Sequence, residues 1–221
     1  MSNRVVLVTG ASRGIGLAIA NKFSSLGYRV LAPSREELDL MSNSSIDAFV
    51  KSVTNVDVIV NNAGINLLSG ILELQDIDLN NTMETNLFGP LRLIQGIIPY
   101  MIKKRYGRIV NISSIWGGVS KERRVSYSIS KSALNGMTRA IAVEVAQYNI
   151  LVNSLAPGFV NTELTKKNNT EEELKQLSDS IPIRRLAEPI EIAEVAGFLG
   201  SENNSYITGQ TIFVDGGFTC I

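Results

Sequence analysis

The sequence predicts an α/β fold, a doubly wound parallel sheet with helices on both faces, in a single domain of three layers. Three observations predict it. Short apolar segments alternate with segments of helical periodicity along the chain. The short segments are apolar at nearly every position, which is typical of strands buried on both faces. The 221 residues, 44% of them hydrophobic, suffice for one such domain over residues 1–221.

The first half of the chain supplies three strands and a possible fourth. Strands are predicted at residues 5–8, 29–32 and 56–60, and residues 38–40 are a candidate for a very short one. Helices are predicted at residues 15–26, which Gly27 ends, at 46–53, and over most of 78–105, where Pro90 and Pro99 are expected to cause irregularities.

The second half continues the alternation. Strands are predicted at residues 108–112, 150–155 and 211–214. Helices are predicted at residues 126–148, near 171–177 and at 189–199, and the remainder of 159–187 is polar and irregular. Helices between buried strands are the pattern that a parallel sheet requires.

Composition excludes several classes of function. Lys+Arg and Asp+Glu number 21 each, so no overall positive charge favours nucleic acid. The absence of histidine excludes Ser-His-Asp triads, and the single Cys220 excludes disulfides within the chain and Cys-rich metal sites. No apolar run is long enough for a signal peptide or a transmembrane helix. We therefore expect a cytoplasmic protein without bound metal that contacts neither nucleic acid nor membrane.

A glycine-rich turn follows the first predicted strand and opens the first predicted helix. Its sequence is Thr9-Gly10-Ala11-Ser12-Arg13-Gly14-Ile15-Gly16, with the spacing GxxxGxG. Glycine permits a tight turn and close approach of the backbone to a pyrophosphate, while the helix N-terminus offers free N–H groups. Loops also use glycine for purely conformational reasons. The position between a strand and a helix favours dinucleotide binding.

Together with this turn, six further features resemble the short-chain dehydrogenases/reductases. They are Asn61-Asn62-Ala63-Gly64, Tyr127-x-x-x-Lys131, Ser114 thirteen positions before Tyr127, Asn86 in Thr85-Asn86-Leu87, Pro157-Gly158, and Val214-Asp215-Gly216-Gly217. The resemblance extends from residue 4 to about 218. It implies a Rossmann-like fold and an oxidoreductase, closest to the 3-oxoacyl-acyl-carrier-protein reductases and similar ketoreductases.

The residues after the second strand indicate which nicotinamide dinucleotide is bound. A ribose 2′-hydroxyl favours a carboxylate partner, whereas a 2′-phosphate favours Arg or Lys. Ser34 and Arg35 follow the strand, and Arg13 of the glycine-rich turn can approach the same place, so NADP(H) is favoured over NAD(H). As the alternative, both arginines could be solvated, and the two glutamates that follow could neutralise Arg35.

By resemblance, the cofactor site draws on the glycine-rich turn, the ends of the next strands and the catalytic helix. Its expected residues are Gly10, Ser12, Arg13, Gly14, Ile15, Gly16, Ser34, Arg35, Asp39, Leu40, Asn62, Ala63, Gly64, Tyr127, Lys131, Pro157, Gly158, Val160 and Thr162. Asp39 and Leu40 would flank the adenine. The segment between Arg35 and Asp39 is shorter than usual in the family, which predicts that the second helix is reduced to a turn.

The candidate catalytic group is Asn86, Ser114, Tyr127 and Lys131. Tyr127 and Lys131 lie four apart on a predicted helix and therefore share a face. A neighbouring ammonium and the charge of an oxidised nicotinamide favour a phenolate, so we expect the pKa of Tyr127 to be lowered. The resemblance implies that Tyr127 is the acid, that Lys131 holds the nicotinamide ribose and that Asn86 anchors a relay water. Taken singly, each of these residues could be an ordinary surface or turn residue.

The substrate is less well determined. Residues 115–125 and 159–186 are expected to line its pocket. If Arg123 or Arg124 faces that pocket, an anionic substrate such as a keto acid or a sugar phosphate is implied, but a solvated loop is the favoured alternative. Trp116 could form an apolar wall, stack on a sugar or belong to the core. Carrier-protein reductases often place basic residues beside the site entrance; Arg105 matches one such position, whereas Tyr148 departs from the other.

The resemblance also implies a homodimer or homotetramer through the helices at 79–105 and 126–148. The apolar residues Leu134, Met137, Ile141 and Val145 suit such an interface, although they could equally be core. Two hypotheses of different kinds follow. The favoured one is an NADPH-dependent ketoreductase acting on a small-molecule carbonyl or alcohol, such as a 3-oxoacyl thioester or an anionic keto sugar. The other is an inactive NADP-binding regulator, which the complete catalytic group disfavours.

Overall fold

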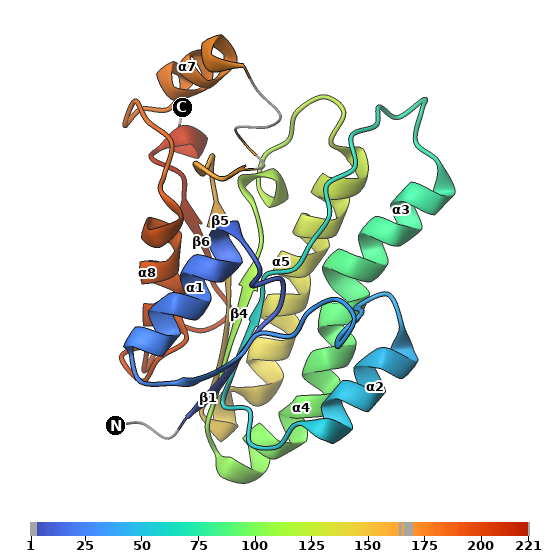
Figure 1. Ribbon diagram of the computed structural model, residues 1–221, viewed down its shortest axis with the longest axis vertical. Helices are drawn as coiled ribbons and strands as arrows, with labels where there is room; N and C mark the ends of the chain where they lie inside the picture. The colour runs from blue at the N-terminus through green and yellow to red at the C-terminus, as the bar shows by residue number, and fades with distance from the viewer. Residues whose placement is uncertain (1–3, 164, 166–169, 221) are drawn as a thin grey trace.

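A single parallel sheet organises the computed structural model, which describes residues 4–163, 165 and 170–220 (Figure 1). The strands are β1 (Val5–Val8), β2 (Arg29–Leu31), β3 (Val58–Asn61), β4 (Gly107–Ile112), β5 (Ile150–Pro157) and β6 (Thr211–Val214). Their order in the sheet is β2-β1-β3-β4-β5-β6, and every neighbouring pair is parallel. The predicted doubly wound α/β sheet is therefore confirmed.

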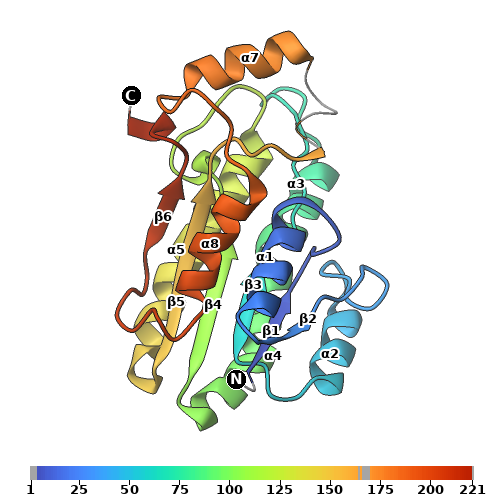
Figure 2. The same ribbon diagram turned by 60° about the vertical axis from the view of Figure 1, so that its left-hand side comes forward.

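The two sides of the strands bury different helices. Figure 2 shows α1 (Gly14–Ser25) and α8 (Pro189–Leu199) in front of the sheet. They pack with Val6, Val58 and Val110, whereas the neighbouring strand residues Leu7, Ile59 and Ile109 contact the other layer. That layer consists of α2 (Asn43–Ser52), α4 (Gly89–Lys104) and α5 (Val125–Val145). Because successive strand residues point to opposite faces, a strand covered on both sides must be apolar throughout.

Residues 38–40 do not form the short strand that was considered possible. The backbone after β2 makes one turn, closed by a 3.0 Å hydrogen bond from Leu38 N to Ser34 O. Leu38 and Leu40 are buried in the core beside α2. Asp39 is held by side-chain bonds, since its N–H donates to Ser45 Oγ at 3.0 Å. The helix that the resemblance places between Arg35 and Asp39 is therefore reduced to a turn, as expected, and β2 is the edge of the sheet.

The segment predicted as an irregular helix over 78–105 has three parts. These are α3 (Asp76–Met83), the π-helical segment η1 (Glu84–Phe88) and α4. Pro90 lies in the first turn of α4 and has no N–H to donate to the carbonyl of Asn86, which accounts for an irregular hydrogen-bond ladder at η1. Pro99 lies within α4 without ending it.

Helix α5 presents its apolar face to the sheet. Leu134 and Val145 are buried, and Met137 and Ile141 are partly buried against the same core. The interpretation of these four residues as an exposed interface is therefore wrong, because α5 uses them to cover the sheet. Although α5 has 21 residues, no helix in the described part of the chain is both long enough and apolar enough to cross a bilayer.

Smaller elements complete the described chain. They are η2 (Ile115–Gly117), η3 (Ala146–Tyr148), α7 (Glu171–Ser180) and η4 (Phe218–Cys220). A reciprocal capping box between Thr170 and Glu173 begins α7. Both ribbon views place α7 beyond the carboxyl ends of the strands, at the same end of the molecule as the loops after β4 and β5 (Figures 1 and 2).

Candidate functional site

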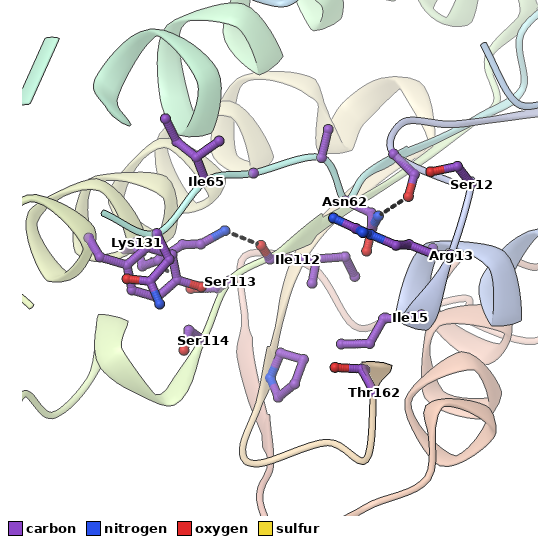
Figure 3. Close-up of a pocket in the computed structure, with 18 of the residues that line it drawn as sticks. Ser12, Arg13, Ile15, Asn62, Ile65, Ile112, Ser113, Ser114, Lys131 and Thr162 are labelled. Atoms are coloured by element: carbon purple, nitrogen blue, oxygen red, sulfur yellow. Dashed lines mark hydrogen bonds between the residues drawn. The ribbon is translucent and has the colours of Figure 1, made fainter. Parts of the chain in front are cut away.

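A cavity of about 580 Å³ lies at the carboxyl ends of the central strands. This is where parallel α/β sheets bind ligands, beside the point at which the strand order reverses. Figure 3 shows Ser12 and Arg13 toward one end of it and Ser114 and Lys131 toward the other. It is lined by these residues predicted from the sequence: Gly10, Ser12, Arg13, Gly14, Ile15, Gly16, Arg35, Asn62, Ala63, Gly64, Ser114, Tyr127, Lys131, Pro157, Gly158 and Thr162.

A second cavity, of about 540 Å³, shares part of this lining. The predicted residues around it include Ser34, Arg35, Asp39 and Leu40. Only Asn86 and Val160 among the predicted site residues line neither cavity. The side chain of Val160 is buried in the core next to α1 and α8.

The glycine-rich turn is fixed to β3 by side-chain hydrogen bonds. Thr9 Oγ1 accepts from Asn62 N at 3.0 Å and from Ala63 N at 3.1 Å. Asn62 Nδ2 donates to the carbonyls of Thr9 and Gly10 at 2.9 and 3.0 Å, the second of which is drawn in Figure 3. A Cβ on Gly16 would lie 2.2 Å from Gly10 O, so no larger residue fits there. The turn therefore needs glycine at position 16 for close packing.

The N-terminus of α1 is suited to an anion. Its N-cap residue, Arg13, makes no side-chain capping bond, and the first turn holds no acidic residue. The first backbone N–H groups of a helix lack partners inside the helix and attract negative charge. Gly14 and Gly16, in this first turn, line the cavity. The residues present thus fit the pyrophosphate of a dinucleotide.

Arg13 and Arg35, the two arginines expected near the end of β2, line the cavity, but Arg35 does not pair with the glutamate that follows it. Arg13 and Arg35 both line the larger cavity. Glu37 accepts a 2.8 Å hydrogen bond from Ser34 N, and this backbone bond is the main cause that lowers the pKa of Glu37. Arg35 instead lies 3.9 Å from the carboxylate of Asp39, with its side chain 78% exposed. Neutralisation of Arg35 by Glu37 is therefore not observed, and the weak contact with Asp39 leaves Arg35 accessible to a further anion.

Ser114 and Tyr127 meet where β4 and α5 converge. Ser114 follows β4 and caps η2, accepting from Trp116 N at 3.2 Å. Burial raises the pKa of Tyr127, while a hydrogen bond with Ser114 and the positive charge of Arg124 act in the opposite direction. With the protein's own side chains alone, the pKa of Tyr127 is raised, because burial of the phenol outweighs the other two effects. The expectation that neighbouring groups lower this pKa is therefore wrong.

Lys131 lies one helical turn after Tyr127 and is buried. Its Nζ donates a 2.7 Å hydrogen bond to Ile112 O (Figure 3) and lies 5.5 Å from the centroid of the Tyr127 ring. Burial lowers the pKa of Lys131 to about 8. Loss of solvent is the whole cause of that shift, since a buried ammonium loses hydration.

Asn86 lies behind the cavity. Its side-chain oxygen accepts from Ile65 N at 2.9 Å, and its amide nitrogen donates to Ile65 O and to Ser130 Oγ at 2.9 and 3.0 Å. A Cβ on Gly64 would lie 3.1 Å from Asn86 Oδ1 and 3.7 Å from Lys131 Nζ. Asn86 therefore holds the cavity-lining segment after β3 close to Lys131.

Sequence reasoning missed several lining residues. They are Ile65, Asn66, Ile112 and Ser113, whereas Glu163 falls within the expected lining segment 159–186. Ile112 and Ser113 had a usable signal, because they end a predicted strand and ligands bind at strand ends. The others follow ends of predicted elements without a distinctive residue type. Residues 164 and 166–169 of the expected substrate loop lie outside the described residues.

The other residues considered for the substrate occupy distinct places. Trp116 is buried and meets Phe159 and Phe218 edge to face, at centroid distances of 6.1 and 6.2 Å. Arg105 ends α4, which leads into the amino end of β4, and it donates to Gln147 O at 3.0 Å. It thus lies near the amino ends of the strands, whereas the cavity lies at their carboxyl ends. The expectation that Arg105 lies beside the site entrance is therefore wrong within this chain.

One cavity joins a turn suited to pyrophosphate with a partly buried Tyr and a buried Lys, and that combination defines an oxidoreductase of the dinucleotide-binding α/β class. Family models specify it further. One described as enoyl-(acyl carrier protein) reductase matches residues 36–219, and one described as short chain dehydrogenase matches residues 4–45. The chain belongs to the short-chain dehydrogenase/reductase family.

Individual relatives match over their whole lengths. The 3-oxoacyl-acyl-carrier-protein reductase FabG of Vibrio cholerae is 36% identical, with 100% of this chain and 99% of that protein covered. A putative NAD(P)-dependent gluconate 5-dehydrogenase of Beutenbergia cavernae, solved with bound NADP, is 31% identical with a TM-score of 0.94 over 100% and 98% of the chains. A gluconate 5-dehydrogenase of Burkholderia cenocepacia, in complex with NADP and tartrate, is 27% identical with a TM-score of 0.91 over 100% and 97%.

Proposed function

We propose that the protein is an NADPH-dependent ketoreductase, with Tyr127 as the acid that protonates the substrate carbonyl. The observation that carries this proposal is that Ser114, Tyr127 and Lys131 line the same cavity as the glycine-rich turn. The names of the relatives point to 3-oxoacyl thioesters and to gluconate as substrates of those proteins. Both classes interconvert a carbonyl and an alcohol, so one chemical step serves either.

The mechanism follows from the protein's own groups. NADPH, when bound, supplies the hydride. Tyr127 donates its phenol proton to the carbonyl oxygen, and the hydroxyl of Ser114, which lines the same cavity, holds that oxygen. Burial raises the pKa of Tyr127 and so keeps the phenol protonated at neutral pH, as an acid requires. After proton transfer, the ammonium of Lys131 stabilises the phenolate from 5.5 Å, the distance of its Nζ from the ring centroid.

The role of Tyr127 is tested with Tyr127→Phe. We expect this variant to bind NADPH with unchanged affinity and to lose nearly all carbonyl reduction, by about 10²–10⁴-fold, because only the acid is removed. NADPH oxidation is measured with an acetoacetyl thioester and with phosphorylated keto sugars. Tyr206→Phe is the matched control, since Tyr206 is 94% exposed. Turnover retained by Tyr127→Phe would contradict the proposed role and would favour a different acid.

The preference for NADPH rests on Arg13 and Arg35, which line the cavity. We expect the double change to alanine to raise the KM for NADPH about 10- to 100-fold, as loss of hydrogen bonds to a charged group predicts, while the KM for NADH changes little. Steady-state kinetics with both cofactors measure this, and NADH is the internal control. An equal loss for both cofactors would show that the arginines do not bind a 2′-phosphate.

We further infer that the substrate is a small-molecule carbonyl or alcohol and that the protein assembles as a homodimer or homotetramer. The support for assembly is an exposed apolar stripe on α5, where Val143 is 83% and Ile129 45% exposed.

A further inference from the structure

Two consecutive arginines precede α5, and the structure gives them different surroundings. Arg123 is paired, with Nη1 2.9 Å from the carboxylate of Glu73, and both side chains are more than half exposed. Arg124 is half-buried, and within the described part of the chain no acidic side chain pairs with it. The backbone of Arg124 also bridges to that of Ser69. Glu73, in the loop after β3, thus pairs with Arg123, and the charge of Arg124 remains available to a ligand.

Arg124 is close to the reacting groups. It is the N-cap residue of α5, three positions before Tyr127 in the first turn of that helix. Its positive charge acts to lower the pKa of Tyr127 against the larger effect of burial. Its guanidinium carbon lies 6.0 Å from the centroid of the Trp116 ring. Trp116 follows Ser114 by two residues, so Arg124 lies near the catalytic end of the cavity, just outside the residues that line it.

The position of Arg124 is unfavourable for an isolated cation. Burial lowers its pKa, the largest effect on this group, because a guanidinium loses hydration there. Arg124 is also the N-cap residue of α5 and makes no side-chain capping bond. The N-terminus of a helix carries partial positive charge and favours Ser, Thr, Asp or Asn at this place. An anion beside Arg124 would relieve both unfavourable effects.

We propose that Arg124 binds an anionic group of the substrate, a carboxylate or a phosphate, adjacent to the carbonyl that Ser114 and Tyr127 engage. A guanidinium forms paired hydrogen bonds with either oxyanion. This inference rests on the proposed function and narrows its substrate class to keto acids and keto phosphates. A neutral 3-oxoacyl chain would leave the guanidinium without a partner, so such thioesters are expected to be the poorer substrates.

Matched pairs of substrates test this. Acetoacetate is compared with methyl acetoacetate, and dihydroxyacetone phosphate with dihydroxyacetone, in the wild type and in Arg124→Gln, Arg124→Lys and Arg123→Gln. We expect Arg124→Gln to raise the KM for the preferred anion about 10- to 100-fold and to leave the KM for its neutral partner unchanged. Arg124→Lys should recover part of the loss. Arg123→Gln should behave as the wild type, because Arg123 pairs with Glu73.

The two anionic arms distinguish a carboxylate from a phosphate as the recognised group. Equal effects of Arg124→Gln on charged and neutral partners would overturn the inference, as would an equal effect of Arg123→Gln. A wild-type preference for the neutral partner in both pairs would also overturn it.

A binding measurement separates this inference from the proposed function. The protein has one tryptophan, Trp116, beside Arg124, so its fluorescence reports on ligands at this place. Titration of the Tyr127→Phe variant with acetoacetate and dihydroxyacetone phosphate should show saturable binding of at least one anion. In the double variant that also carries Arg124→Gln, the Kd for that anion should rise about tenfold or more. Binding without turnover in the wild type would overturn the reductase and keep the anion site. Turnover of neutral carbonyls without anion binding would overturn the anion site and keep the reductase.

Discussion

Lys131, which we propose acts in catalysis, illustrates at the scale of one residue how a buried charge lowers the stability of a fold. Its ammonium is buried, and burial lowers its pKa to about 8. In the unfolded chain the pKa of lysine is about 10.4, so below pH 8 the fold must keep a charge that the environment disfavours. By linkage this shift costs about 3 kcal/mol at pH 7, and replacing Lys131 would cost about 1 kcal/mol in turn, because Ile112 O would lose its donor.

We therefore predict that Lys131→Met abolishes turnover and stabilises the protein at pH 7 by about 1–2 kcal/mol. The folded-state pKa is depressed, so the unfolded chain binds more protons between about pH 8 and 10.5, and wild-type stability recovers as pH rises through that window. The advantage of the variant should vanish above about pH 10.5. Urea unfolding at pH 7 and 10.5 measures this, with the exposed Lys51→Met as control. A variant less stable than wild type at pH 7 would contradict the account.

At the scale of elements, the junction of β1, β3 and α1 is held by two side chains, Thr9 and Asn62. Asn62 Nδ2 donates to the carbonyls of Thr9 and Gly10, which hold the glycine-rich turn in place. Asn62→Ala leaves both carbonyls without this donor. We expect a loss of about 1–3 kcal/mol in the free energy of unfolding and a higher Kd for NADPH. Chemical unfolding and NADPH fluorescence titration measure the two effects.

Asn21→Ala on the exposed side of α1 is the matched control and should change neither quantity. If Asn62→Ala lowered stability and left the Kd for NADPH unchanged, the turn would keep its shape without these bonds. The link between β3 and the turn would then be structural alone.

Sequence reasoning predicted well the strands that are buried on both faces, as at β1 (Val5–Val8), which is buried at all four positions and has the predicted bounds. Helix α8 (Pro189–Leu199) and the edge strand β6 (Thr211–Val214) also have the predicted bounds. Residues 38–40 failed as a strand because side-chain bonds of Asp39 with Ser45 and Met41 replace a ladder, and an alternating Leu-Asp-Leu is compatible with both arrangements. Tertiary contacts, which the sequence does not display, decide such short segments.

The parts of the candidate site that lie in local sequence motifs were predictable, and the parts that depend on tertiary contacts were not. Glycines and strand-end residues belong to short continuous motifs in the sequence. Most of the cavity lining could therefore be predicted from those motifs. The different surroundings of Arg123 and Arg124 were not, because they depend on Glu73, a residue distant in sequence, and on a backbone conformation with φ of 60° at Arg123. Likewise, the direction of the Tyr127 pKa shift depends on how deeply the phenol is buried.

At the scale of the whole molecule, α5 presents two kinds of surface. The inward one covers the sheet and includes Leu134 and Val145. The outward one carries Ile129 and Val143, fourteen residues apart and thus within about 40° of each other around a helix of 3.6 residues per turn. Between them the exposed positions include Ser132 and Ala140, whose small side chains permit a close approach of a second helix.

We predict that this outward stripe of α5 joins two copies of the chain. Val143→Arg introduces a charge into a contact that requires apolar packing, so it should shift the assembly to a smaller species. Light scattering after size-exclusion chromatography measures the mass. Tyr206→Arg, at a site outside α5 that is 94% exposed, is the control and should keep the wild-type mass. A monomeric wild type, or a Val143→Arg variant of wild-type mass, would leave Val143 as an ordinary exposed residue and direct the search for an interface to the other faces of the molecule.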